Sequence, residues 1–122
     1  MTLNLRPATR APCGGDPPGC TATYLFVDSI VLSTKAKGPK TDAIAKVTIK
    51  DDCGNNVAGA IVSGTFSGDV SGSQSATTNS AGEATLKITI TGSISSFSFC
   101  VDDVTGSATY NAGANVETCD SI

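Results

Sequence analysis

Apolar and polar residues alternate through most of the chain after residue 21. The clearest run is 83–91, in which alanine, leucine and isoleucine alternate with glutamate, lysine and threonine. Residues 43–50 alternate in the same way, with Ala45, Val47 and Ile49 on one face and lysine or threonine at 46, 48 and 50 on the other. A period of two is typical of a strand with one face buried and one face in water. Both segments are therefore predicted to be β-strands.

The first expected strand, 24–33, contains a change of phase. Leu25 and Val27 share one face, whereas Ile30 and Leu32 share the other. A β-bulge near Asp28 and Ser29, or a strand that switches between sheets at this point, would produce this change of phase.

The remaining segments extend the same pattern. A strand is expected at 58–66 with alternate residues from Ala58 to Phe66 inward, followed by a short edge strand and loops at 68–78. A further strand at 96–101 has Phe97, Phe99 and Val101 inward, and a last one covers 107–110. Turns are expected at 52–56 and 79–82. About seven short antiparallel strands predict an all-β fold, an immunoglobulin-like Greek-key β-sandwich stapled by disulfides.

The first twenty residues differ from the rest of the chain. They contain four of the five prolines and several glycines, which leave no room for a strand of useful length. We expect residues 1–20 to be a linker or an extended arm, and residues 21–122 to be the sandwich. At 122 residues the chain fits one domain.

The five cysteines, at 13, 20, 53, 100 and 119, indicate disulfides in an oxidising compartment. In immunoglobulin strand order the second and sixth strands run the same way in opposite sheets, which brings Cys53 near Cys100 at one end. This pair is the first expectation. The alternation turns Cys100 outward, however, so the bond would be a strand-end staple for which Cys119 competes. Cys13 and Cys20 could close a small loop, or each could tie the arm to the body.

The same strand order gathers two acidic pairs at that end, Asp51 with Asp52 and Asp102 with Asp103. Carboxylates and backbone carbonyls are the ligands that calcium prefers, so a calcium site is one hypothesis. The alternative is that these acids are solvated charges at strand ends.

Catalysis and nucleic-acid binding are both disfavoured by composition. The chain has no histidine, which removes the common nucleophilic triads and most zinc hydrolase sites. Its net charge is −3, and seven of the eight basic residues lie at or before Lys50 while eight of the eleven acidic residues follow it. In a sandwich of interleaved strands this asymmetry along the chain need not become an asymmetry in space. No apolar run is long enough for a membrane helix.

Several motifs together carry a resemblance to a known family. They are Asp51 to Ala60, Gly64 to Gly68, Ser80 to Gly82, Phe99 to Thr105 and Tyr110 to Asp120. With these motifs the run from Leu25 to Cys119 resembles the bacterial immunoglobulin-like modules of secreted subtilisin-like proteases and surface proteins and, more loosely, the Big-1 repeats of intimin and invasin. The resemblance implies a non-catalytic spacer, stabiliser or adhesion surface without a cofactor.

The sequence therefore favours a structural or adhesive module of an extracellular or cell-surface prokaryotic protein. Its expected partners are other domains of a larger protein or copies of itself, with no nucleic acid and no membrane insertion. One alternative is a self-assembling filament or surface-layer subunit that uses the N-terminal arm. Another is a polysaccharide-binding accessory domain of a secreted hydrolase.

Overall fold

The computed structural model describes residues 20–122, so the predicted arm, apart from Cys20, lies outside the described residues. The described chain is almost entirely strand and turn, which confirms the all-β prediction. A single short 3-10 helix, η2 (Ala112–Ala114), precedes the last strand within this part of the chain. The strands are β1 (Tyr24–Lys37), β2 (Lys40–Asp51), β3 (Ile61–Gly68), β4 (Gly72–Thr77), β5 (Glu83–Thr91), β6 (Phe97–Thr105), β7 (Thr109–Tyr110) and β8 (Cys119–Ser121).

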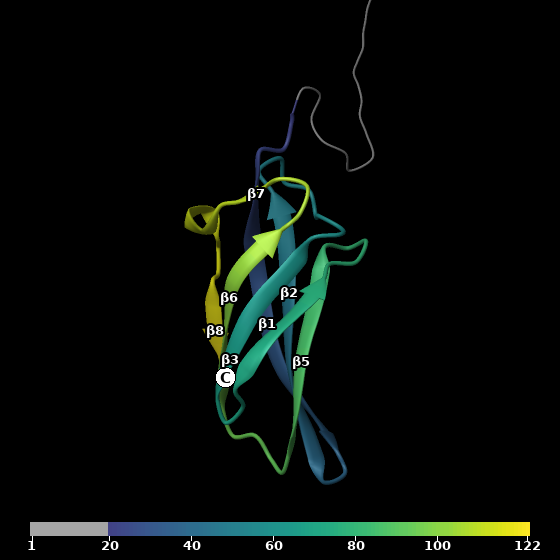
Figure 1. The fold of residues 1–122 in the computed structure, drawn as a ribbon, viewed down its shortest axis with the longest axis vertical. Helices are drawn as coiled ribbons and strands as arrows, with labels where there is room; N and C mark the ends of the chain where they lie inside the picture. The colour runs from purple at the N-terminus through teal and green to yellow at the C-terminus, as the bar shows by residue number, and fades with distance from the viewer. Residues whose placement is uncertain (1–19) are drawn as a thin grey trace, which may run out of the picture.

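These strands form two four-stranded sheets that pack as a β-sandwich. Sheet A has the order β5-β2-β1-β7 and sheet B the order β4-β3-β6-β8. Neighbouring strands are antiparallel, except for the short parallel pair of β1 and β7. The chain passes from one sheet to the other after β2, β4, β5, β6 and β7, as Figure 1 shows.

The core lies between the sheets and follows the predicted alternation. Residues 43, 45, 47 and 49 of β2 are fully buried, and the inward residues of β3 and β6 are buried too. In β5, Ala84 and Leu86 are buried, whereas Ile88 and Ile90 are partly buried. The expected change of phase in β1 is confirmed, because Val27 pairs with Ile49 while Ser29 pairs with Thr48. Asp28 is thus the extra residue of a β-bulge, and Ile30 returns to the buried face.

The structure corrects several strand boundaries. β6 continues to Thr105 rather than ending at Val101, because a second bulge at Asp102 restores the inward position of Val104. Ala58 is exposed in the turn before β3 instead of facing inward. The strand expected at 107–110 is reduced to β7, and β8 was not expected at all, because its three residues carry no clear alternation.

The chain enters and leaves the sandwich at opposite ends (Figure 1). We call the end that holds Cys20, the start of β1 and the turn after β2 the entry end. At the other end, the exit end, the hairpin turn between β1 and β2 lies beside the end of β5, where the Gly92 amide donates to the Pro39 carbonyl. β6 begins there, and Ile122 exchanges two backbone hydrogen bonds with Phe97.

Candidate functional site

The cysteines form two disulfides, Cys20–Cys53 and Cys100–Cys119, with Cα atoms 6.1 and 4.0 Å apart. The expected Cys53–Cys100 pair is therefore wrong. Cys100 does face outward as predicted, and its partner is the competing Cys119. Because Cys20 is bonded to Cys53, it closes no loop with Cys13, which lies outside the described residues.

The length of β6 explains the wrong pairing. Cys53 follows β2 at the entry end, as predicted, but Cys100 lies opposite Thr65 in the interior of sheet B. The residue of β6 nearest the entry end is Thr105, which pairs with Ile61. The alternation in the sequence does not reveal the bulge at Asp102, so it predicts that β6 ends at Val101. In that prediction Cys100 lies at the end of the strand, close to Cys53.

The first acidic pair stabilises the entry end. Asp51 is buried, and its Oδ1 accepts hydrogen bonds from the amides of Cys53 and Asn55, both 3.0 Å long. Asp52 accepts from the Thr23 hydroxyl at 2.7 Å and the Thr23 amide at 2.8 Å, which anchors the segment before β1. These two bonds, the hydroxyl first, hold the pKa of Asp52 below its ordinary value.

The second acidic pair lies in the other sheet. Asp102 and Asp103 belong to β6, where Asp102 accepts a hydrogen bond of 2.6 Å from the Thr65 hydroxyl. Within residues 20–122 no three histidine, cysteine, aspartate or glutamate side chains form a group that could hold a metal ion. The structure does not bring the four carboxylates into one calcium site.

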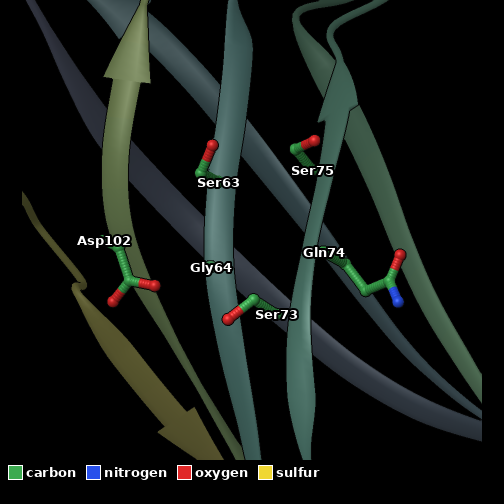
Figure 2. A pocket seen from close by; sticks show the side chains of 6 residues that line it. All are labelled: Ser63, Gly64, Ser73, Gln74, Ser75 and Asp102. Carbon is green, nitrogen blue, oxygen red and sulfur yellow. The ribbon is translucent and has the colours of Figure 1, made fainter.

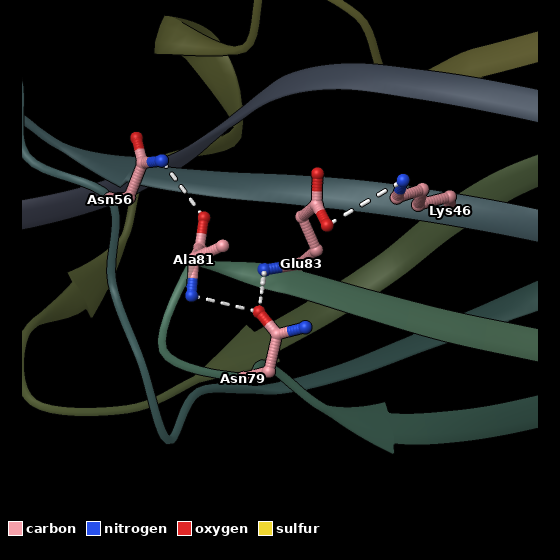
Figure 3. Close-up of polar contacts among 5 residues, drawn as sticks. All are labelled: Lys46, Asn56, Asn79, Ala81 and Glu83. Carbon is pink, nitrogen blue, oxygen red and sulfur yellow. Dashed lines mark hydrogen bonds and ion pairs between the residues drawn. The ribbon is translucent and has the colours of Figure 1, made fainter.

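Two turns interlock at the entry end, as Figure 3 shows. The Asn79 side chain accepts from the amides of Ala81 and Glu83 at 2.9 and 3.1 Å, which closes the predicted turn at 79–82. Asn56, from the turn after β2, donates to the Ala81 carbonyl at 2.8 Å. Gly82 fits beneath Asn56, where a Cβ atom would lie 2.9 Å from the Asn56 Cβ. The two turn motifs seen in the sequence are therefore parts of one structure.

A shallow polar hollow lies on the outer face of sheet B (Figure 2). Its volume is about 330 Å³, and its lining consists of Ser63, Gly64, Ser73, Gln74, Ser75 and Asp102. The Thr65 hydroxyl, which donates to Asp102, lies 3.4 Å from the Ser73 hydroxyl. This arrangement can exchange hydrogen bonds with a polar group. Sequence reasoning missed it, because the serines of β3 and β4 become neighbours only through the strand register.

No protein-family model, no curated protein and no solved structure matches this chain. The resemblance to bacterial immunoglobulin-like modules therefore stays a prediction from its motifs.

Two findings bear on the environment of the protein. The two disulfides indicate an oxidising compartment. Across residues 20–122, no helix has the length and apolar character needed to cross a membrane.

Proposed function

We propose that the chain is a non-catalytic, immunoglobulin-like structural module of an extracellular or surface protein, and that it holds its neighbours apart under tension. The carrying observation is that the chain enters at one end of the sandwich and leaves at the other (Figure 1), and that each terminal segment is bonded by a disulfide to an internal part of the chain. A module that enters at one end and leaves at the other can join others in a line.

The positions of the two disulfides support a role in bearing load. Cys20 precedes β1 and is bonded to the turn after β2, while Cys119 begins β8 and is bonded to β6. A pull on the two termini passes first through these bonds. Residues 21–52 and 101–118 lie within the two covalent loops and cannot extend until the disulfides are reduced.

The strand order supports the immunoglobulin-like assignment. β2 and β6 run in the same direction in opposite sheets, and β5-β2-β1 faces β4-β3-β6. Such an order is typical of Greek-key sandwiches of this kind. Two further observations favour a secreted protein: the resemblance of the motifs to modules of secreted proteins, and the two disulfides.

Single-molecule stretching of the full chain between its termini tests this proposal. We expect the oxidised module to unfold at a higher force than the reduced one, with extension limited to the chain outside the two covalent loops. Reduction should lengthen the unfolded chain by roughly 110 Å for the Cys20–Cys53 loop and roughly 60 Å for the Cys100–Cys119 loop, at about 3.5 Å per residue. Equal unfolding forces in both states would contradict a load-bearing role for the disulfides.

A further inference from the structure

All six lysines of the chain lie on one face of the molecule. Residues 43, 45, 47 and 49 of β2 fill the core, so Lys40, Lys46 and Lys50 face away from it. Directly opposed residues of antiparallel strands share a face. Lys35 and Lys37 of β1 and Lys87 of β5 therefore lie on the same outer face, because their partners in β2 are Asp42, Lys40 and Ile44. The six lysines, which come from three strands, thus gather on the outer face of sheet A.

Four of these lysines surround one carboxylate near the exit end. We call this group the Asp42 cluster, formed by Asp42 with Lys35, Lys37, Lys40 and Lys87. Asp42 is only 1% exposed, and its Oδ2 lies 2.9 Å from the Lys37 Nζ and 3.9 Å from the Lys87 Nζ. The Thr89 hydroxyl donates to its Oδ1 at 2.5 Å. The Thr89 bond and the Lys37 ammonium hold the pKa of Asp42 below its ordinary value, so the carboxylate stays charged at neutral pH.

The cluster carries an excess of positive charge that the rest of the face lacks. About half of the Lys37 and Lys87 side-chain surface is accessible to solvent, and Lys35 and Lys40 are exposed. Toward the entry end, Lys46 lies 3.6 Å from Glu83 and Lys50 lies 3.8 Å from Asp28, so each lysine there has its own carboxylate. In the Asp42 cluster one carboxylate pairs with both Lys37 and Lys87, and Lys35 and Lys40 form no ion pair with the described residues.

We infer that the Asp42 cluster is a binding surface for an anionic polysaccharide. Its exposed ammonium groups match carboxylate or sulfate groups along such a polymer. The hydroxyls of Ser33, Thr89 and Thr91, which lie on the same face, match sugar hydroxyls. Asp42 positions Lys37 and Lys87, which would otherwise repel each other, and leaves their net charge available to a ligand.

Two other partners fit the cluster less well. Nucleic-acid-binding proteins that hold single strands combine basic grooves with aromatic platforms. The aromatic residues of this face, Tyr24 and Phe26, lie near Lys50 at the entry end. A second copy of the chain would have to offer an acidic surface that matches the cluster. The acidic residues on the outer face of sheet B are Asp102 and Asp103, and serine and threonine side chains surround them.

Binding of the full chain to heparin and to alginate, which carry sulfate and carboxylate groups, tests the inference. Dextran serves as the neutral control, and polyphosphate and double-stranded DNA as other polyanions. We expect both acidic polysaccharides to bind, with an affinity that falls as salt is added. The double variant K35Q/K40Q should bind about tenfold more weakly and lower the slope of log affinity against log salt by about two, near one for each lysine.

The matched control is K46Q/K50Q, which removes the same charge from the other end of the same face. Its affinity should change by less than about twofold, and circular dichroism should show that both variants remain folded. Equal losses in the two variants, or no binding by the unmodified chain, would overturn the inference. Equally tight binding of polyphosphate or DNA would overturn the assignment to a polysaccharide. Dimerisation that K35Q/K40Q abolishes, without polysaccharide binding, would assign the surface to a second copy instead.

Discussion

Gly64 shows how closely single residues are fitted in this sandwich. It is buried in β3 beneath the hollow of sheet B, where a Cβ atom would clash with the Phe99 ring and lie 2.7 Å from the Cys100 carbonyl oxygen. The Phe99 ring packs against Phe66, with ring centroids 4.8 Å apart, so it cannot easily move away. The absence of a side chain at Gly64 makes room for an aromatic residue on the neighbouring strand.

Replacing Gly64 with alanine should therefore destabilise the protein strongly. We expect a loss of about 3 kcal/mol in the free energy of unfolding, because the added methyl group overpacks a closed core. Urea unfolding measures the loss, and Ser67→Ala, an exposed change on the same strand, should stay within about 0.5 kcal/mol. Equal stabilities of the two variants would show that Phe99 can repack.

Asp52 gives the entry end a dependence on pH. Its folded-state pKa is lowered, first by the Thr23 hydroxyl and then by the Thr23 amide, from an ordinary value of 3.8. The stability that it contributes is therefore present above pH 3.8 and is lost as the pH falls through the lowered value. Asp52→Asn should unfold at a lower temperature than the native chain at pH 7, and the difference should shrink towards pH 2. A difference that is constant from pH 7 to pH 2 would exclude this role.

A β-bulge can be predicted from the sequence when apolar residues on both sides of it show the change of phase. The bulge at Asp28 follows from the shift between Val27 and Ile30, because four apolar residues report both phases of the strand. The bulge at Asp102 has only Val104 after it to report the second phase. A single valine does not distinguish a continuing strand from a loop, so the alternation predicts an end of β6 at Val101 rather than at Thr105.

At the scale of elements, β8 depends on its disulfide more than any other strand of residues 20–122. It has three residues, pairs only with β6 and buries none of its side chains fully. The Cys100–Cys119 bond holds it at Cys119, and the Val101 amide donates to the Thr118 carbonyl just before it. A strand this short has too few contacts to offset its own conformational entropy.

Removing this bond in C100A/C119A should detach β8 while sheet A stays folded. The loop-entropy model gives a loss of about 3 kcal/mol for this loop. Hydrogen exchange at the Val101 and Ile122 amides should become faster, because both donate to carbonyls in or beside β8 and β6. In the control C20A/C53A these amides should keep their protection, whereas the Thr23 and Tyr24 amides should lose theirs. Unchanged exchange at Val101 in C100A/C119A would show that β8 holds without the bond.

At the scale of the whole molecule, the sequence predicts the class of fold but not its sites. The alternation of apolar and polar residues indicates which side chains are buried, because successive side chains of a strand point to opposite faces of the sheet. The hollow beside Asp102 and the Asp42 cluster depend on the register between strands, which joins residues such as Lys35 and Asp42 across a hairpin and Asp42 and Thr89 across the sheet. No pattern within one strand records which residue of the next lies opposite.

The two covalent loops also change what a cut in the backbone does. A protease that cleaves once between Cys20 and Cys53, or once between Cys100 and Cys119, leaves both fragments joined through sulfur. A single cut in the stretch from 54 to 99, much of which lies in the paired strands β3, β4 and β5, instead leaves two fragments held together by packing alone. The exposed hairpin turn at Gly38 and the segment around η2 can thus be nicked without breaking the connection between the two termini.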